Sequence, residues 1–94
     1  MTRRPFKWSK HKAEANLRKH EVSFEEARTA FDDSLFVVFS DPDHSGEENR
    51  FILMGESSER RLLVISYTEQ PEGLRLISAR KATRRERKAY EEEI

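Results

Sequence analysis

The stretch Leu74–Tyr90, LRLISARKATRRERKAY, joins the end of a sheet to the start of a helix. Leu74 to Ala79 is an alternating run of apolar and polar residues, which is typical of a strand. Thr83-Arg84-Arg85-Glu86 is a capping box, in which the first and last side chains bind backbone amides at a helix start. This box predicts a helix that continues to about Glu92. The chain therefore finishes on a strand followed by a helix, and the sheet for that strand must come from upstream.

Three further strands are predicted immediately before this one, each separated from the next by turn-forming or polar residues. Gln70–Gly73, with its proline and glycine, is a hairpin turn. Consecutive strands joined by such short connections pair antiparallel. The upstream strands are Leu35–Phe39, Arg50–Gly55 and Leu62–Thr68.

The N-terminal part predicts one short strand and two helices. Phe6–Trp8 alternates like a strand, and Ser9 is a helix N-cap for residues 10–19. Ser23-Phe24-Glu25-Glu26 is a second capping box, in which the Glu26 side chain is expected to return to the Ser23 amide. The predicted fold is α+β in a single domain spanning residues 1–94. It has a short N-terminal strand, two helices, a four-stranded antiparallel sheet and a C-terminal helix.

Composition excludes several kinds of site. The 94 residues contain no cysteine, so disulfides, thiolate zinc sites and cysteine nucleophiles are absent. No run approaches the ~18 apolar residues of a membrane span, and the charged N-terminus is not followed by the apolar stretch of a signal peptide. The composition suits a reducing cytosol, so we predict a cytoplasmic protein.

The formal net charge is zero, yet the charges are segregated along the chain. Residues 3–20 have seven cations and one acid, and residues 75–88 have the same numbers. Residues 21–59 have two cations and eleven acids. Such segregation favours either pairing between segments of the fold or binding of an anionic partner by the basic segments.

The last helix places its cations where they oppose the helix dipole. The start of a helix already has a partial positive charge, so arginines there are mildly unfavourable. The same free amides and cations make a good phosphate site. A solvated basic face is the alternative, but an arrangement that works against helix stability favours anion binding. The cations without a partner at helical spacing are Arg80, Lys81, Arg84 and Arg85.

Tyr67 and Glu69 share one face of a predicted strand, and Glu69 lies one hairpin turn from Arg75. A Tyr, a Glu and several arginines near a phosphate suit RNA cleavage, with acid–base groups on the 2′ and 5′ oxygens and arginines on the phosphate. Taken alone, Tyr67 is better explained as an ordinary residue of an amphipathic sheet. Strand alternation puts Arg75 out of phase with Ser78, so Arg75 and Arg80 share a site only if the strand ends by Ala79.

The segment Asp41–Glu48 is acidic and contains His44. Its carboxylates suggest a divalent metal, but their spacing fits no calcium loop. An acidic loop without metal is the preferred interpretation, with His44 as a candidate acid–base group.

Two long motifs resemble one protein family. They are K-x-x-x-N-L-x-K-H-x-V-S-F-E-E-A at Lys12–Ala27 and I-S-A-R-K-A-T-x-x-E-R-x-x-Y at Ile77–Tyr90. Together with the segments DPDHS, RFILMG and RLLVISYTE, they resemble the BrnT toxins of type II toxin–antitoxin systems. The resemblance extends from Phe6 to Glu92, and both motifs are long enough to make chance agreement implausible.

The resemblance implies a RelE-like fold and a ribonuclease that arrests translation without a metal or cofactor. It also implies a BrnA antitoxin with a ribbon–helix–helix part, through which the complex would bind operator DNA and repress its own operon. By position, the main active-site candidates are Arg80, Arg75 and Glu69, and the weaker ones are Lys10 or Lys12, Trp8 and His44.

Departures from the family pattern leave a second hypothesis open. Gln70 stands where an arginine is often found, which removes one possible phosphate contact. Glu21 stands where glycine is common and costs about 1 kcal/mol in a left-handed helix end. The alternative to an active ribonuclease is a catalytically weak binding module, the folded scaffold or co-repressor of a DNA-binding complex.

Overall fold

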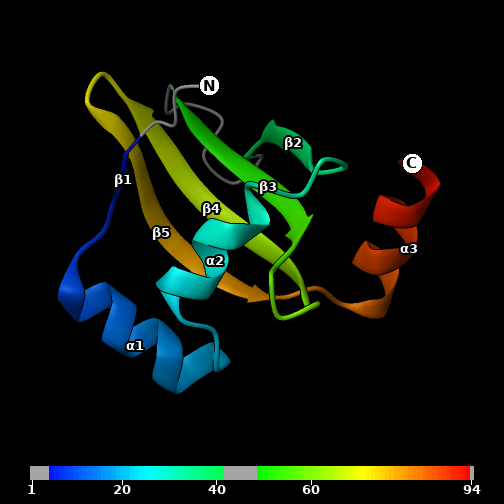
Figure 1. Cartoon of the computed structure of the whole chain (residues 1–94), viewed down its shortest axis with the longest axis horizontal. Coiled ribbons are helices and arrows are strands. Elements are labelled where there is room, and N and C mark those ends of the chain that lie inside the picture. The colour runs from blue at the N-terminus through cyan, green and yellow to red at the C-terminus, as the bar shows by residue number, and fades with distance from the viewer. Residues whose placement is uncertain (1–4, 42–48, 94) are drawn as a thin grey trace.

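Five strands form one mixed sheet in the order β1-β5-β4-β3-β2 (Figure 1). The computed structural model describes residues 5–41 and 49–93. No helix in these ranges is long and apolar enough to cross a membrane. The elements along the chain are β1 (Phe6–Lys7), α1 (Lys10–His20), α2 (Phe24–Ala30), β2 (Val37–Ser40), β3 (Arg50–Glu56), β4 (Leu62–Gln70), β5 (Gly73–Lys81) and α3 (Arg84–Glu93).

The predicted α+β class is confirmed, but the sheet has five strands instead of four. β1 joins the edge of the sheet parallel to β5, with Phe6 beside Leu74 and Lys7 beside Arg75. The Leu74 amide donates to the Pro5 carbonyl over 2.9 Å. Two helices and three strands separate β1 from β5, so no short turn imposes the antiparallel pairing found between β2, β3, β4 and β5.

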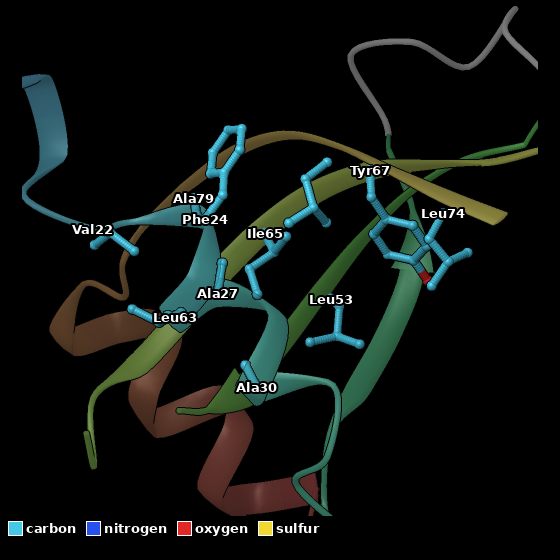
Figure 2. Close-up of a cluster of buried hydrophobic side chains, with 11 residues drawn as sticks. Val22, Phe24, Ala27, Ala30, Leu53, Leu63, Ile65, Tyr67, Leu74 and Ala79 are labelled. Carbon is cyan, nitrogen blue, oxygen red and sulfur yellow. The ribbon is translucent and has the colours of Figure 1, made fainter. Parts of the chain in front are cut away.

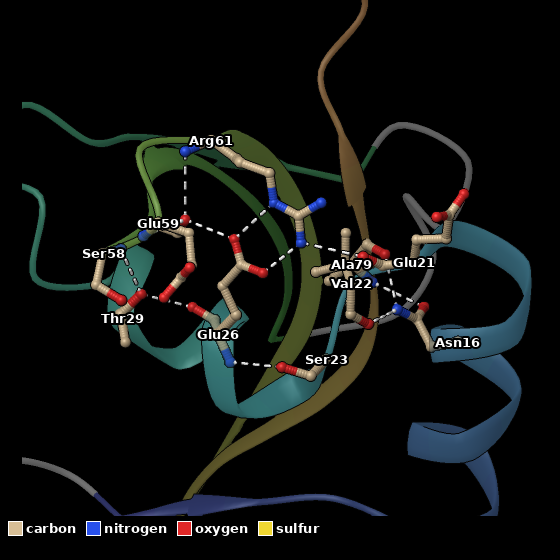
Figure 3. Close-up of polar contacts among 11 residues, drawn as sticks. Asn16, Glu21, Val22, Ser23, Glu26, Thr29, Ser58, Glu59, Arg61 and Ala79 are labelled. Carbon is tan, nitrogen blue, oxygen red and sulfur yellow. Dashed lines mark hydrogen bonds and ion pairs between the residues drawn. The ribbon is translucent and has the colours of Figure 1, made fainter.

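All three predicted helix starts are confirmed, although one is only half a capping box. The hydroxyl of Ser9 accepts from the Lys12 amide, and that of Ser23 accepts from the Glu26 amide. At Thr83 both halves form, because Glu86 also accepts from the Thr83 amide over 2.9 Å. The expected return of the Glu26 carboxylate to Ser23 is wrong, since that carboxylate binds Arg61 and Ser57 instead (Figure 3).

Helices α1 and α2 cover one face of the sheet, and the main core lies beneath them (Figure 2). Phe24 is fully buried against this face, and α2 approaches β3 closely at Gly55. A Cβ added to Gly55 would lie 2.7 Å from the Ala30 carbonyl oxygen, so only glycine fits there. The strand residues in this core are Leu53, Leu63, Ile65, Tyr67, Leu74, Leu76 and Ala79.

Asn16 ties α1 to the edge of β5. Beyond Arg75 this edge has no paired strand among the described residues. The buried Asn16 amide donates to the Ala79 and Val22 carbonyls over 2.8 and 2.9 Å and accepts from the Ala79 amide over 3.0 Å (Figure 3). One side chain therefore satisfies backbone groups that an edge strand would otherwise leave open.

A β-bulge changes the phase of β5 halfway along the strand. Tyr67 pairs with Leu76 and Ser66 with Ser78, so Ile77 is an extra residue with no partner on β4. Residues paired across antiparallel strands share a face, and an extra residue shifts the alternation by one. Leu76 and Ala79 consequently both enter the core, which simple alternation forbids.

Candidate functional site

The sheet face opposite α1 and α2 has a row of three cations and one threonine across four strands. Residues paired between neighbouring strands lie on the same face. The pairs Lys7–Arg75, Arg75–Thr68 and Thr68–Arg50 therefore place Lys7, Arg75, Thr68 and Arg50 side by side. Neither a hydrogen bond nor an ion pair of the Arg75 side chain exists within the described ranges. Arg75 is thus the member of this row most available to an anion.

The bulge adds Arg80 to the same face. Arg80 pairs with Val64, four residues before Thr68 on β4, so Arg75 and Arg80 are both directed away from the core. Their partners on β4, Thr68 and Val64, are four residues apart, so the two arginines are separated by about 13 Å along the sheet at a rise of ~3.3 Å per residue. The prediction that they share a site only if the strand ends by Ala79 is wrong, because β5 continues to Lys81 and the bulge brings them into phase. We call this surface, with Lys7, Arg50, Ser66, Thr68, Arg75, Ser78 and Arg80, the arginine face.

Arg80 has a partner that helical spacing did not reveal. Its two terminal nitrogens each donate to one oxygen of Glu86 over 2.8 Å. Glu86 also accepts from the Thr83 amide, so one carboxylate holds Arg80 and caps α3. The Arg80 pair lowers the pKa of Glu86 to about 2. Arg80 has no partner at helical spacing, as predicted, but it pairs with Glu86 six residues later, and an RNA phosphate would compete with Glu86 for this guanidinium.

A carboxyl titration followed by NMR tests this arrangement. In the unaltered chain we expect Glu86 to titrate with a pKa of about 2. In Arg80→Gln the charge-assisted hydrogen bonds are lost, and the Glu86 pKa should move most of the way to its ordinary value of 4.5. Arg84→Gln, which changes a nearby cation on the same helix, serves as the control. Equal Glu86 titration in both variants would contradict the bidentate pair.

Between Arg75 and Arg80 the arginine face is lined by hydroxyls. Ser66 pairs with Ser78, and the buried Ser66 Oγ has no hydrogen-bond partner within the described residues. Lys12 and Lys19 of α1 line a shallow hollow with Ser78 at the open edge of β5. The predicted RNA-binding residue Lys12 therefore lies at the margin of the arginine face.

The structure separates Tyr67 and Glu69 from the two arginines. Tyr67 pairs with Leu76 and Glu69 with Leu74, both on the helix-covered face. Tyr67 is 5% exposed and packs against the rings of Phe31 and Phe51 at 5.1 and 5.8 Å between centroids. Glu69 is thus paired with the residue before Arg75, and its side chain lies on the other side of the sheet from that of Arg75.

The remaining predicted residues fall in three places. Trp8 and Lys10 line a groove on the helix side with Leu17, and Trp8 packs edge-on to Phe24. Lys81, Arg84 and Arg85 are exposed where β5 leads into α3. His44 lies outside the described residues.

Of the acidic segment Asp41–Glu48, the structure describes Asp41 alone. Asp41 is buried and forms an ion pair with Arg50 over 3.3 Å. No group of three or more His, Asp or Glu side chains able to hold a metal occurs in the described ranges. Asp41 is therefore best explained as the carboxylate that orients Arg50 on the arginine face.

The chemistry that the arginine face supports is binding and stabilisation of phosphate charge. Fixed guanidinium groups match phosphate geometry and offset charge that develops during phosphoryl transfer. Glu86 is ionised at neutral pH and held by Arg80, so it is a poor proton donor. Sequence reasoning missed Lys7 and Arg50 because only the pairing register aligns them with Arg75. An outward lysine in the predicted Phe6–Trp8 strand was the available signal for Lys7.

Both the sequence and the fold of this chain match those of known proteins. The family model of the ribonuclease toxin BrnT of type II toxin–antitoxin systems matches residues 8–86. No curated protein matches the chain. The crystal structure of the Brucella abortus ribonuclease toxin BrnT, at 1.1 Å resolution, superposes with a TM-score of 0.64 and 20% identity, covering 82% of this chain and 94% of that one. At this identity the superposition supports a shared fold alone.

Proposed function

Because the chain belongs to the BrnT family of ribonuclease toxins of type II toxin–antitoxin systems, we propose that it cleaves RNA on the arginine face, without a metal ion, and so arrests translation. The observation that carries this proposal is the alignment of Lys7, Arg75 and Arg50 across the sheet, with Arg80 about 13 Å farther along. Four cations on one face match the backbone of a single RNA strand, whose phosphates dominate binding.

The proposed roles follow from exposure and position. Arg75 and Arg80 bind the phosphates that flank the cleaved bond, and Arg80 exchanges Glu86 for phosphate when RNA binds. Lys12, at the margin of the arginine face, contacts the RNA strand where the RNA leaves that face. Arg84 and Arg85, exposed at the start of α3, extend the same path, and Lys81 at the end of β5 precedes them.

The predicted acid–base groups are ranked by their access to that path. His44 lies outside the described residues, so it stays a candidate on the resemblance to the family alone. Glu69 lies at the rim of the sheet on the other side, and Tyr67 would have to leave an aromatic cluster to reach RNA. Of the two described groups we therefore propose Glu69 ahead of Tyr67, with His44 as the further candidate that the resemblance supplies. Trp8 and Lys10, on the helix side, are proposed to contact only RNA that wraps around β1.

Membership of a type II family implies a protein antitoxin. We propose a BrnA-type antitoxin with a ribbon–helix–helix part, which neutralises the toxin and forms with it a cytoplasmic complex that represses the operon. Operator DNA is then contacted through the antitoxin.

Cleavage of a labelled single-stranded RNA, with EDTA present, tests the enzyme proposal. Removing one charge-assisted phosphate contact costs about 1.5 kcal/mol, so Arg75→Gln should lower kcat/KM about tenfold. With about four contacts, the log–log dependence of RNA affinity on salt should have a slope near −3, and the variant should lose about 0.7 of it. Arg18→Gln, an exposed arginine on α1, is the matched control.

Three outcomes separate the readings. An equal decrease of kcat/KM in Arg75→Gln and Arg18→Gln would contradict RNA binding on the arginine face. RNA that binds with the expected slope but stays intact would favour the binding-module alternative. Cleavage that stops in EDTA would contradict a metal-free mechanism.

A further inference from the structure

The segment Leu35–Phe39 is apolar but exposed. Leu35, Phe36, Val38 and Phe39 are 49%, 46%, 39% and 42% exposed, and Leu17 on α1 is the other large apolar residue of comparable exposure in the described ranges. The run was predicted as a strand because of its apolar residues, yet the strand β2 does not bury them. Contiguous apolar exposure of this kind marks a contact surface for another molecule.

The outer backbone edge of β2 is open as well. β2 is the last strand of the sheet, and within residues 5–41 and 49–93 no strand pairs with its outer edge. The Asp41 amide donates to the Arg50 carbonyl over 3.3 Å, which fixes the hydrogen-bonding phase of the β2–β3 ladder. Bonded and non-bonded pairs alternate, so Val38 and Ser40 direct their N–H and C=O groups away from β3. An edge with outward groups is a template for another strand.

A groove lies next to this edge, between β2, β3 and α3. It has a volume of about 150 Å³ and is lined by the apolar side chains of Val37, Phe39, Met54 and Ala89, by Tyr90 and by the carboxylate of Glu93. An apolar cavity of about 150 Å³ holds a benzene ring, so this groove takes one aliphatic or aromatic side chain. An open strand edge beside a side-chain pocket is the arrangement used in β-strand addition, where the backbone gives affinity and the pocket gives specificity.

We propose that an extended apolar segment of the antitoxin pairs with β2 through Val38 and Ser40 and places one side chain in the groove beside Tyr90. This inference rests on the family assignment in the proposed function, which supplies a protein partner, and does not depend on RNA cleavage. The antitoxin then approaches the sheet from its β2 edge, while Arg75 and Arg80 lie on β5, which β3 and β4 separate from β2.

A second copy of the chain is the weaker occupant on grounds of area. The four exposed side chains present roughly 350 Å², since a whole aromatic side chain presents about 150–250 Å². A stable interface needs about 800 Å² from each partner. A copy that paired edge to edge would bury too little, whereas a segment of a second protein also fills the groove and continues beyond it.

The test uses the antitoxin encoded beside the toxin as the probe and calorimetric affinity as the readout. Val38→Pro removes one outward N–H and leaves the β2–β3 ladder intact, so it should weaken antitoxin binding more than tenfold. Val38→Ala keeps that N–H, and its affinity for the antitoxin should fall only a few-fold. Phe39→Arg places a charge in the groove wall and should also lose more than tenfold. Leu17→Arg, equally exposed but on α1, should bind as the unaltered chain does.

The outcomes are distinguishable from those of the ribonuclease test. Val38→Pro and Phe39→Arg are expected to cleave RNA at the unaltered rate and to melt within a few degrees of it. If both bind the antitoxin normally, β2 is not the docking edge. If the unaltered chain alone sediments as a dimer that Val38→Pro dissociates, with antitoxin affinity unchanged, the edge is an interface between copies and the proposal is overturned. If RNA is never cleaved, the binding result still stands.

Discussion

Asn16→Asp is expected to lower the free energy of unfolding by about 3–5 kcal/mol at pH 7.5, which is a large part of the stability of so small a domain. Asn16 is buried and makes three hydrogen bonds with the backbone of Val22 and Ala79. An aspartate keeps the shape and the bond from the Ala79 amide. It cannot donate to the Val22 and Ala79 carbonyls, and its charge would face both of them.

The pH dependence of that loss identifies its cause. Two facing carbonyls and burial raise the pKa of an aspartate at this position above its unfolded value. The folded state then binds more protons than the unfolded state, so the variant loses stability as pH rises through the unfolded pKa, near 3.9, toward the raised folded pKa. The loss relative to the unaltered chain should therefore be smaller at pH 4 than at pH 7.5.

Urea unfolding at both pH values measures the effect. Glu14→Gln, an exposed acid-to-amide change on the same helix, should stay within about 0.5 kcal/mol. Asn16→Ala should lose about 2–4 kcal/mol without the pH dependence, because it orphans the backbone groups without adding a charge. An Asn16→Asp variant as stable as Glu14→Gln would contradict the edge-capping role of this amide.

Arg61→Met is expected to lower the free energy of unfolding by about 2–3 kcal/mol at neutral pH. Arg61 binds both oxygens of the Glu26 carboxylate and also donates to the Glu21 carbonyl over 3.0 Å (Figure 3). The Glu26 side chain is only 10% exposed, so the variant leaves a largely buried charge with Ser57 as its remaining partner. Because the Arg61 side chain is 31% exposed, the loss is placed below that of a fully buried pair.

The sign of the pH dependence changes in this variant. The hydrogen bond from Arg61 lowers the pKa of Glu26 below 4.5, against the opposing effect of burial. In the unaltered chain the stabilisation by Glu26 is complete above about pH 4.5 and is lost as pH falls through the lowered pKa. In Arg61→Met burial dominates and raises that pKa, so acidification toward pH 4 should relieve part of the loss.

Two further variants make the measurement decisive. Glu26→Gln combined with Arg61→Met removes the buried charge and should recover part of the stability lost in Arg61→Met. Arg60→Met, at the exposed neighbouring position in the same turn, should change stability by less than about 0.5 kcal/mol. If Arg60→Met and Arg61→Met had equal free energies of unfolding, a stabilising role of the Glu26–Arg61 ion pair would be contradicted.

The contacts of Asn16 with Ala79 and of Glu26 with Arg61 both connect distant parts of the chain. For this reason the first contact was overlooked in the sequence, and Glu26 was assigned the wrong partner. Asn16 lies inside the motif that resembles BrnT, yet nothing in its neighbours indicates that it reaches Ala79. Glu26 has the spacing of a capping residue, but its carboxylate binds the charged Arg61 side chain and does not return to the Ser23 amide.

The sequence by itself determined the local elements of this protein. Ser9, Ser23 and Thr83 start the three helices where their capping patterns predict, and the turn at Gln70–Gly73 fixes a hairpin. These signals act over three or four residues, so they are complete in the sequence. The long motifs also identified the family, because agreement over so many positions does not depend on knowing the fold.

Only the tertiary structure decided which residues share a surface. The unpaired Ile77 can be recognised only against β4, and it is what brings Arg75 and Arg80 onto one face while Tyr67 and Glu69 remain on the other. Lys7 joins that face because β1 pairs parallel with β5, and no turn between these two strands indicates that pairing in the sequence. The physical reason is that strand register is set by partners far away in the chain, and a shift of one residue exchanges the two faces of a strand.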